Sequence, residues 1–376
     1  MINFSINKTL FLQALNTTKR AISSKNAIPI LSTIKIDVTP EGVALSGSNG
    51  QISIENFISI KDENAGLLVT SPGSILLEAT FFINVVSSLP DVTLDFKEIE
   101  QKQVLLTSGK SEITLKGKDA DQYPRIQEIA ASNPLVLETK LLKQLINETA
   151  FAASVQESRP ILTGVHFVLS NNKELKTVAT DSHRMSQKVI TLEKNGDNFD
   201  VVIPSRSLRE FTSVFSDDIE TVEVFFANNQ ILFRSEHISF YTRLLEGNYP
   251  DTNRLIPTSH NTQIEFYVPE LLSAIERASL LSHEGRNNIV RLSISPDSVV
   301  LYGNSPEIGK VEEALNYENV SGEALDISFN PDYMKDALRA FGDMNITVKF
   351  LSPIRPFTLE PTETELDFIQ LITPVR

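Results

Sequence analysis

The strongest constraint on how this chain of 376 residues can fold is an internal repeat. An apolar stripe with helical spacing lies within residues 78–89, and it recurs twice at a constant offset of 126 residues. Nine apolar positions in register at one offset are hard to attribute to chance, so we predict three copies of one unit. The stripes are Phe82, Val85, Leu89 (with Phe81 and Val86), then Leu208, Phe211, Phe215, then Met334, Ala337, Phe341.

A second helix is predicted at the head of each copy. After Pro29 and Pro160 we expect strands that begin with Ile30-Leu31 and Ile161-Leu162. Tyr123-Pro124 and Tyr249-Pro250 close the first two copies within polar linkers, which predicts domains at 1–125, 126–255 and 256–376. The apolar positions of the heading helices are Leu10, Phe11, Ala14, Leu15, then Leu141, Leu142, Leu145, Ile146, and more loosely Leu271, Leu272, Ile275, Ala278.

Runs of alternating residues separate the helices, for example 34–38, 52–57, 165–169 and 346–350. Period-two alternation with frequent turns is typical of antiparallel sheet with one buried face. Each copy is therefore predicted to be an α+β unit of two helices and roughly eight short strands. Two helices are too few to cover two sheets, so we expect the helices to share one face and the sheets to form the outside.

Composition favours a globular protein: 41% of residues are hydrophobic and the mean hydropathy is -0.07. No apolar run approaches the roughly 18 residues that span a membrane, and the N-terminus shows no secretory signal. The absence of cysteine excludes disulfides and thiolate chemistry and fits a cytoplasmic protein. The residues indicate no membrane association.

The net charge of -14 argues against a protein that grips nucleic acid. We predict six helices, at 7–21, 78–88, 139–153, 205–216, 269–282 and 331–341. Together they carry 10 basic and 7 acidic residues, whereas the rest of the chain carries 24 and 41. Gln13, Asn16 and Arg20 lie on the polar side of the first helix. This pattern is typical either of scattered solvated charges or of a surface that tolerates a phosphate backbone through weak, salt-sensitive contacts.

Motifs for catalysis are weak. The five histidines lack metal-ligand spacing, and Gly109-Lys110-Ser111 lacks the glycine of a phosphate-binding loop, so it predicts a hairpin turn. Asp181 precedes His183 by two residues, which is compatible with a carboxylate that orients an imidazole base. The alternative is a strand at 175–179 followed by a turn whose Asp binds its own backbone.

A resemblance to a known family covers the whole chain. It rests on the run Thr177–Met185, on Gly247–Asp251, on Pro29–Leu31 and on the terminal Pro374–Arg376. The chain resembles the bacterial DNA polymerase III beta subunits, the DNA sliding clamps. The resemblance implies three DNA-clamp units per chain and two chains joined head to tail into a ring. Helices would line the hole and sheets would lie outside. It implies a processivity factor in DNA replication, with no catalytic residues, metal or cofactor.

The resemblance also implies a pocket for short partner peptides that contain glutamine, leucine and phenylalanine. Ser182 stands where glycine is common in the family, Thr373 and Val375 where methionines are common, and Pro160 and Ile161 replace aromatic residues. The implied pocket residues are Leu162, Thr180, Ser182, His183, Arg184, Met185, Pro250, Leu255, Leu371, Thr373 and Val375.

Two further surfaces are implied in the same way. Lys19, Arg20, Lys25 and Gln156 would face double-stranded DNA without reading its sequence. At the homodimer interface, Ile113 and Leu115 of one chain would face Leu280 and Leu281 of the other. Ion pairs would join Lys102 and Lys110 to the acids Glu307, Glu312 and Glu313. Glu112 stands where a basic residue is common in the family.

The partners implied are the DNA polymerase III alpha or PolC-type polymerase, the clamp loader and other replication and repair enzymes. The alternative hypothesis, from another class, is a hydrolase or nuclease that uses Asp181 and His183.

Overall fold

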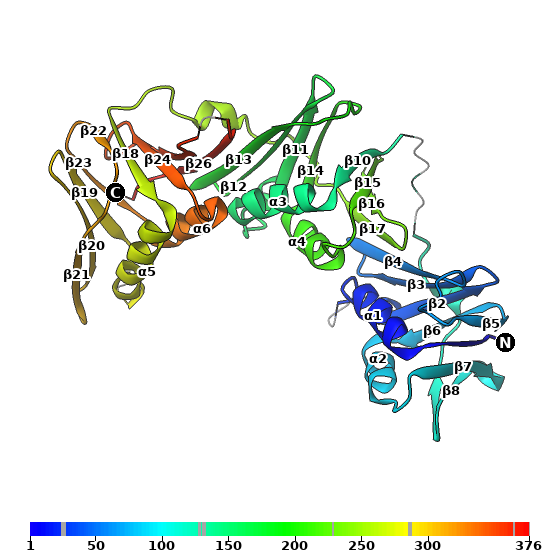
Figure 1. Ribbon diagram of the computed structural model, residues 1–376. Coiled ribbons are helices and arrows are strands. Elements are labelled where there is room, and N and C mark those ends of the chain that lie inside the picture. Colours follow the sequence, from blue (N-terminus) through cyan, green and yellow to red (C-terminus); the bar gives the residue numbers. More distant parts are fainter. Residues whose placement is uncertain are drawn as a thin grey trace. The chain divides into compact units, whose positions relative to one another are not determined.

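The computed structural model describes residues 1–23, 28–126, 129, 133–227, 229–284, 288–363 and 365–375. They form two compact units, residues 1–140 with 210–244 and residues 141–209 with 245–376. The helices agree closely with the predicted ones (Figure 1). They are α1 Lys8–Lys19, α2 Ala79–Ser88, α3 Thr139–Thr149, α4 Ser205–Val214, α5 Val268–Glu284 and α6 Pro331–Phe341.

The first unit contains two antiparallel sheets, of five and eight strands among its described residues. The first, in spatial order, is β5 Leu68–Ser71, β1 Asn3–Asn7, β7 Thr93–Ile99, β8 Gln103–Ser108 and β9 Ser111–Lys116. The second is β10 Leu135–Glu138, β15 Thr221–Phe226, β16 Gln230–Arg234, β17 Ile238–Arg243, β4 Ile52–Ser59, β3 Gly42–Ser48, β2 Thr33–Thr39 and β6 Gly73–Glu78.

The second unit also has two antiparallel sheets, of nine and four strands within the described ranges. The larger is β14 Phe199–Pro204, β11 Gly164–Ser170, β12 Glu174–Thr180, β13 Arg184–Thr191, β26 Phe368–Ile372, β25 Phe357–Pro361, β24 Asn345–Phe350, β18 Thr262–Tyr267 and β22 Val320–Gly322. The smaller is β21 Gly309–Ala314, β20 Ser298–Ser305, β19 Val290–Ser295 and β23 Leu325–Phe329.

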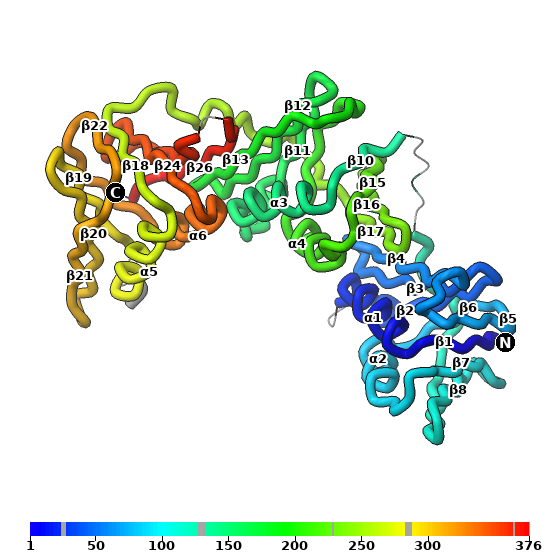
Figure 2. Tube along the Cα trace, viewed as in Figure 1, coloured from blue at the N-terminus to red at the C-terminus, as the bar shows by residue number. Residues whose placement is uncertain are grey.

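The large sheets continue across the boundaries of the predicted copies. In the first unit β17 lies beside β4 (Figure 2). The two strands pair with Phe240 opposite Ile54. In the second unit β26 pairs with β13, with Leu371 opposite Met185. Strands from consecutive copies therefore share one hydrogen-bonded sheet.

Helices α1, α2 and α6 begin at side-chain caps, and the helices bury most of the predicted stripes. Asn7 Oδ1 accepts hydrogen bonds from the first amides of α1, and the Glu78 carboxylate does the same for α2. In the first unit Phe11 and Phe82 pack edge to face beneath the sheets. Phe81 departs from the prediction and is mostly exposed, because the neighbouring Phe82 already occupies the buried face of α2.

The prediction of strands directly after Pro29 and Pro160 is wrong. Ile30-Leu31 and Ile161-Leu162 lie in short 3-10 turns, η1 Pro29–Ser32 and η5 Pro160–Thr163, that precede β2 and β11. Proline is preorganised for the first helical position, and the last hydroxyl of each turn donates to the proline carbonyl, at 2.7 Å in both copies.

Candidate functional site

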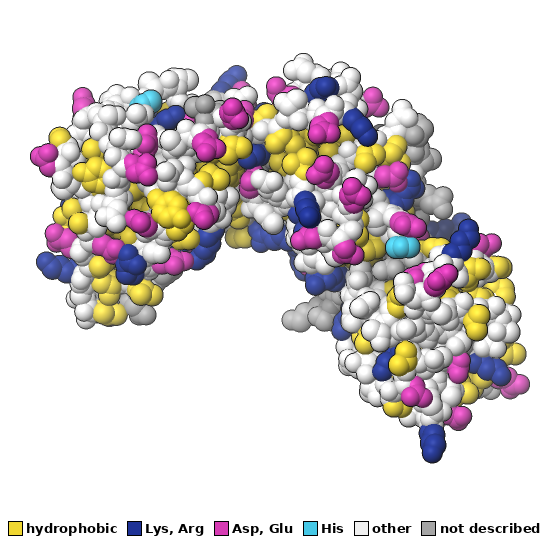
Figure 3. Space-filling view, in the orientation of Figure 1, with side chains coloured by type: hydrophobic (Ala, Val, Ile, Leu, Met, Phe, Trp, Pro, Cys, Tyr) yellow, Lys and Arg dark blue, Asp and Glu magenta, His cyan; other side chains and the backbone are white. Residues whose placement is uncertain are grey.

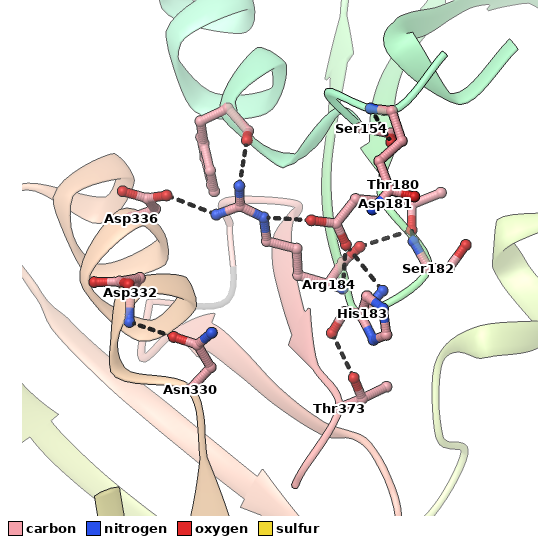
Figure 4. Close-up of polar contacts among 12 residues, drawn as sticks. Ser154, Thr180, Asp181, Ser182, His183, Arg184, Asn330, Asp332, Asp336 and Thr373 are labelled. Carbon is pink, nitrogen blue, oxygen red and sulfur yellow. Dashed lines mark hydrogen bonds and ion pairs between the residues drawn. The ribbon is translucent and has the colours of Figure 1, made fainter. Parts of the chain in front are cut away.

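The candidate site is built on the tight turn between β12 and β13. Asp181 Oδ1 accepts hydrogen bonds from the backbone N–H groups of His183 (2.9 Å) and Arg184 (3.0 Å) (Figure 4). Ser182 adopts a left-handed φ of 80°, and the Thr180 hydroxyl donates to the Arg184 carbonyl at 2.6 Å. The predicted turn, with an Asp that binds its own backbone, is confirmed.

The first copy contains the same turn with different side chains. Asn49 Oδ1 accepts from the amides of Gln51 and Ile52, and the Ser48 hydroxyl donates to the Ile52 carbonyl. Gly50, with a φ of 88°, takes the left-handed position that Ser182 holds in the second copy. The fold therefore forms this turn without the side chains His183 and Arg184.

The same turn weakens the hydrolase hypothesis. The Asp181 Oδ1 atom is engaged by two turn amides and its Oδ2 atom accepts from Arg184 Nε at 3.0 Å. The His183 ring stacks on Tyr333 instead, with centroids 6.4 Å apart. Among the described side chains, no group of three or more His, Cys, Asp or Glu could hold a metal ion. Asp181 thus shapes the turn and orients Arg184.

An apolar cluster lies beside the turn. Val178, Met185 and Leu371 are buried together, with Tyr249 and Ile256 partly buried around them. The Tyr249 hydroxyl accepts a hydrogen bond from the Thr180 amide at 3.1 Å, and burial raises the pKa of this phenol. Met185 and Leu371 meet because β13 and β26 place them opposite one another.

The C-terminal tail is fastened to the turn. The Thr373 amide and hydroxyl both donate to the His183 carbonyl, at 2.9 and 2.7 Å (Figure 4). Two residues on, the Val375 amide donates to the Ser328 carbonyl at 2.8 Å. The tail and the turn thus form one hydrogen-bonded rim beside the apolar cluster.

The remaining predicted pocket residues differ in exposure. Leu162 is buried in η5, and its carbonyl accepts from the Ser154 amide at 2.8 Å. Pro250 is exposed, and Leu255 is 44% exposed at the end of η6 Thr252–Leu255. The structure groups Met185 and Leu371 in one apolar cluster, which does not include Leu162.

Sequence reasoning missed several residues of this site. Val178 is an apolar residue of β12, Ile369 of β26 packs partly buried against the apolar cluster, and Tyr249 stands directly before Pro250. Tyr333 and Asp336 on α6 carry no local signal, because their role depends on contact with Arg184, 152 residues before Asp336.

The residues predicted for a dimer interface lie on two edge strands, in the turns that precede them, in η2 Glu100–Lys102 and on α5. In the order of the described strands, β9 ends one sheet of the first unit and β21 ends one sheet of the second. Leu280 on α5 is 69% exposed and Ile113 on β9 is partly exposed. Leu115, two residues further along the same face of β9, is 7% exposed in the single chain and packs, like the partly buried Ile113, against the core of its own unit.

Some of the charged residues near these edges have partners within the chain. Arg277 donates two hydrogen bonds to Glu313, which lowers the pKa of the Glu313 carboxyl and raises the pKa of the Arg277 guanidinium. Both line a groove of about 360 Å³ between α5 and β21. Lys102 lies 3.7 Å from Glu98. The other predicted interface charges, all exposed, are Lys110, Glu112, Glu307 and Glu312.

The residues predicted to face DNA lie near the ends of helices. Lys19 is partly exposed at the end of α1, and Arg20 is exposed with its Nη1 3.5 Å from Glu210 Oε2. Gln156 is exposed after η4 Ala150–Ala152. Lys25 lies outside the described residues. Figure 3 shows basic and acidic side chains interspersed over the visible face, so charge there is mixed.

Three repeated units, each with two helices and antiparallel sheets, are the architecture of a DNA sliding clamp. Models for the N-terminal, central and C-terminal domains of the DNA polymerase III beta subunit match residues 2–127, 136–251 and 253–376. The chain belongs to this family of DNA polymerase III beta subunits, the sliding clamps of replication processivity.

The relatives are close over the full length. The chain is 74% identical to the beta sliding clamp of Streptococcus pneumoniae across all of both chains. It superposes with a TM-score of 0.99 on the crystal structure of a Streptococcus pneumoniae DNA polymerase III beta chain, at 74% identity, and covers all of it. The beta subunit of Streptococcus pyogenes DNA polymerase gives a TM-score of 0.96 at 64% identity, again over all of both chains.

Within this family the beta subunit is the processivity subunit and is not itself catalytic. No helix in the described ranges is long and apolar enough to cross a membrane.

Proposed function

We propose that the chain works as a homodimeric ring that encircles duplex DNA and tethers the replicative polymerase. The observation that carries this proposal is the match to a beta sliding clamp over all of both chains at 74% identity. We expect the ring to act in the bacterial cytoplasm, associated with the nucleoid during replication. Its domains would be 1–125, 126–255 and 256–376, each centred on one two-helix unit.

The dimer would close through the two sheet edges. An unpaired edge strand exposes backbone donors and acceptors that favour a partner strand. If β9 of one chain pairs with β21 of the other, both edges are used and two identical interfaces close the ring. The exposed side chain of Leu280 and the partly exposed Ile113 would then be covered, with Lys110, Glu307 and Glu312 at the rim.

Partners would bind at the apolar cluster of Val178, Met185 and Leu371 beside the 181–184 turn. An apolar floor with a polar rim suits aliphatic and aromatic anchors, as short segments with glutamine, leucine and phenylalanine provide. Leu255 and Pro250 are exposed and free to contact such a segment. The polymerase, the clamp loader and other DNA enzymes would share this one site.

The ring would hold DNA by topology and not by attraction. A charge of -14 and a mixed surface support only weak phosphate contacts, through residues such as Lys19, Arg20 and Gln156. Escape would then require an interface to open or a DNA end to pass through the hole.

The test compares DNA with and without ends. Once placed by an ATP-driven loader, the protein should persist on nicked circular DNA for minutes at about 0.15 M salt, a concentration that weakens exposed charge contacts. Cutting the circle at unchanged salt should release it rapidly. Equal loss from circular and linear DNA would indicate ordinary electrostatic binding and would overturn the ring.

A further inference from the structure

We propose that Asp336 on α6 is a positioning residue of the peptide pocket, which acts through Arg184 to hold the 181–184 turn and the C-terminal tail in a receptive geometry. The inference rests on the proposed function, because the pocket is part of it. Neither Asp336 nor α6 is implied by the sequence motifs of the turn.

Arg184 connects three segments that are distant in the sequence. Its Nε donates to Asp181 Oδ2 at 3.0 Å, its Nη2 to the Phe151 carbonyl at 2.8 Å, and its Nη1 to Asp336 Oδ2 at 2.6 Å (Figure 4). The guanidinium also lies over the Tyr333 ring at 4.7 Å. A planar fork of donors suits this arrangement, which a lysine could not reproduce. We call these contacts the Arg184 brace.

The brace is continuous with the rim of the pocket. The Arg184 carbonyl accepts from the Thr180 hydroxyl, and the preceding carbonyl, of His183, accepts both hydrogen bonds from Thr373. The residue that follows Arg184 is Met185, part of the apolar floor. A shift of the Arg184 side chain would therefore disturb the turn, the tail and the floor together.

The Asp336 carboxylate lies closer to Arg184 than to its other basic neighbour, Arg339. Its Oδ2 lies 2.6 Å from Arg184, whereas its Oδ1 lies 3.9 Å from Arg339 Nη1. Arg339 instead donates to Glu276 of α5 at 2.9 Å. Asp336 therefore ties the pocket turn to α6, while Arg339 ties α6 to α5. Loss of Arg339 should leave the brace intact.

The experiment measures binding of a labelled Gln-Leu-x-Leu-Phe peptide to the full-length protein by fluorescence anisotropy. Asp336→Asn should weaken binding about fivefold, a size expected for a charge-assisted contact that solvent partly screens. Asp336→Glu should restore part of the affinity. The matched control is Asp332→Asn, which removes a carboxylate of the same helix with similar exposure, 40% against 37%. It should bind the peptide like the parent, as should Arg339→Gln.

A double-mutant cycle separates positioning from general stability. If Asp336 acts through Arg184, the effect of Asp336→Asn should largely disappear in an Arg184→Gln background. Additive effects, or an Asp336→Asn variant that binds like the parent, would overturn the inference and leave the pocket standing. A parent protein that binds no peptide would overturn the pocket, and this inference with it. Thermal unfolding of every variant shows whether a loss of binding reflects unfolding.

Discussion

The exposed leucine on α5 gives a quantitative test of the proposed ring. Burial of a whole leucine side chain stabilises by about 2 kcal/mol. Leu280 is 69% exposed in the single chain, so covering it contributes up to about 1.4 kcal/mol at each interface. Two identical interfaces double the effect. We therefore expect Leu280→Ala to raise the dimer dissociation constant about 100-fold.

Sedimentation velocity over a range of concentrations measures this change. The parent should sediment at micromolar concentration as twice 41.8 kDa, and Leu280→Ala should dissociate at concentrations where the parent does not. The matched control is Ile354→Ala, which removes a side chain of similar exposure, 59%, from the same unit. Leu281→Asp, on the same helix, should favour the monomer more strongly. An unchanged dissociation constant for Leu280→Ala would refute the placement of α5 at the interface.

Three further predictions concern single side chains. A Gln-Leu-x-Leu-Phe peptide should bind with micromolar affinity, about -8 kcal/mol, and Leu255→Asp should abolish binding without lowering the unfolding temperature, since the side chain is 44% exposed. Asp181→Ala should destabilise by about 2 kcal/mol, because two turn amides and Arg184 lose an acceptor. Asp181→Asn should lower the stability less than Asp181→Ala, because Asn49 supports the same turn in the first copy. Equal decreases in the unfolding temperature of the two variants would contradict this. Glu148→Ala should lower the free energy of unfolding, measured with denaturant, by about 3–5 kcal/mol, because it leaves the buried Lys188 without its ion-pair partner at 3.4 Å. A decrease below about 1 kcal/mol would mean that water reaches Lys188.

The internal symmetry shows why two copies with one fold can carry different sites. The Asn49 turn and the Asp181 turn share their hydrogen bonds, and Tyr123 and Tyr249 each have a pKa raised by burial beneath the corresponding strand. A second groove, of about 320 Å³, lies beside Tyr123 in the first unit. Its lining includes Lys35 and Asp37, which form an ion pair at 2.6 Å. Tyr123 also belongs to an apolar cluster, with Leu31 and Leu76, so the two copies surround the corresponding tyrosine with different apolar side chains.

Much of the local structure was determined by the sequence alone. The helices follow from apolar residues at helical spacing, and this pattern predicted all six to within a few residues. The turn at Asp181 was also predictable, because its side chain bonds to amides two and three residues ahead. Each of these features depends on interactions within about one turn of chain, so a short window of sequence contains its cause.

Only the tertiary structure decided how these pieces combine. Local alternation cannot specify that β17 pairs with β4 or that β26 pairs with β13, since register depends on which strand edges meet in space. The burial of Leu115 likewise depends on how β9 packs against the core of its unit. The ion pair between Arg184 and Asp336 could not be predicted for the same reason, because it joins residues 152 positions apart. Contacts between residues so far apart in the sequence depend on how whole helices and strands pack against one another. A local sequence pattern reflects only the interactions between residues that are close in the chain.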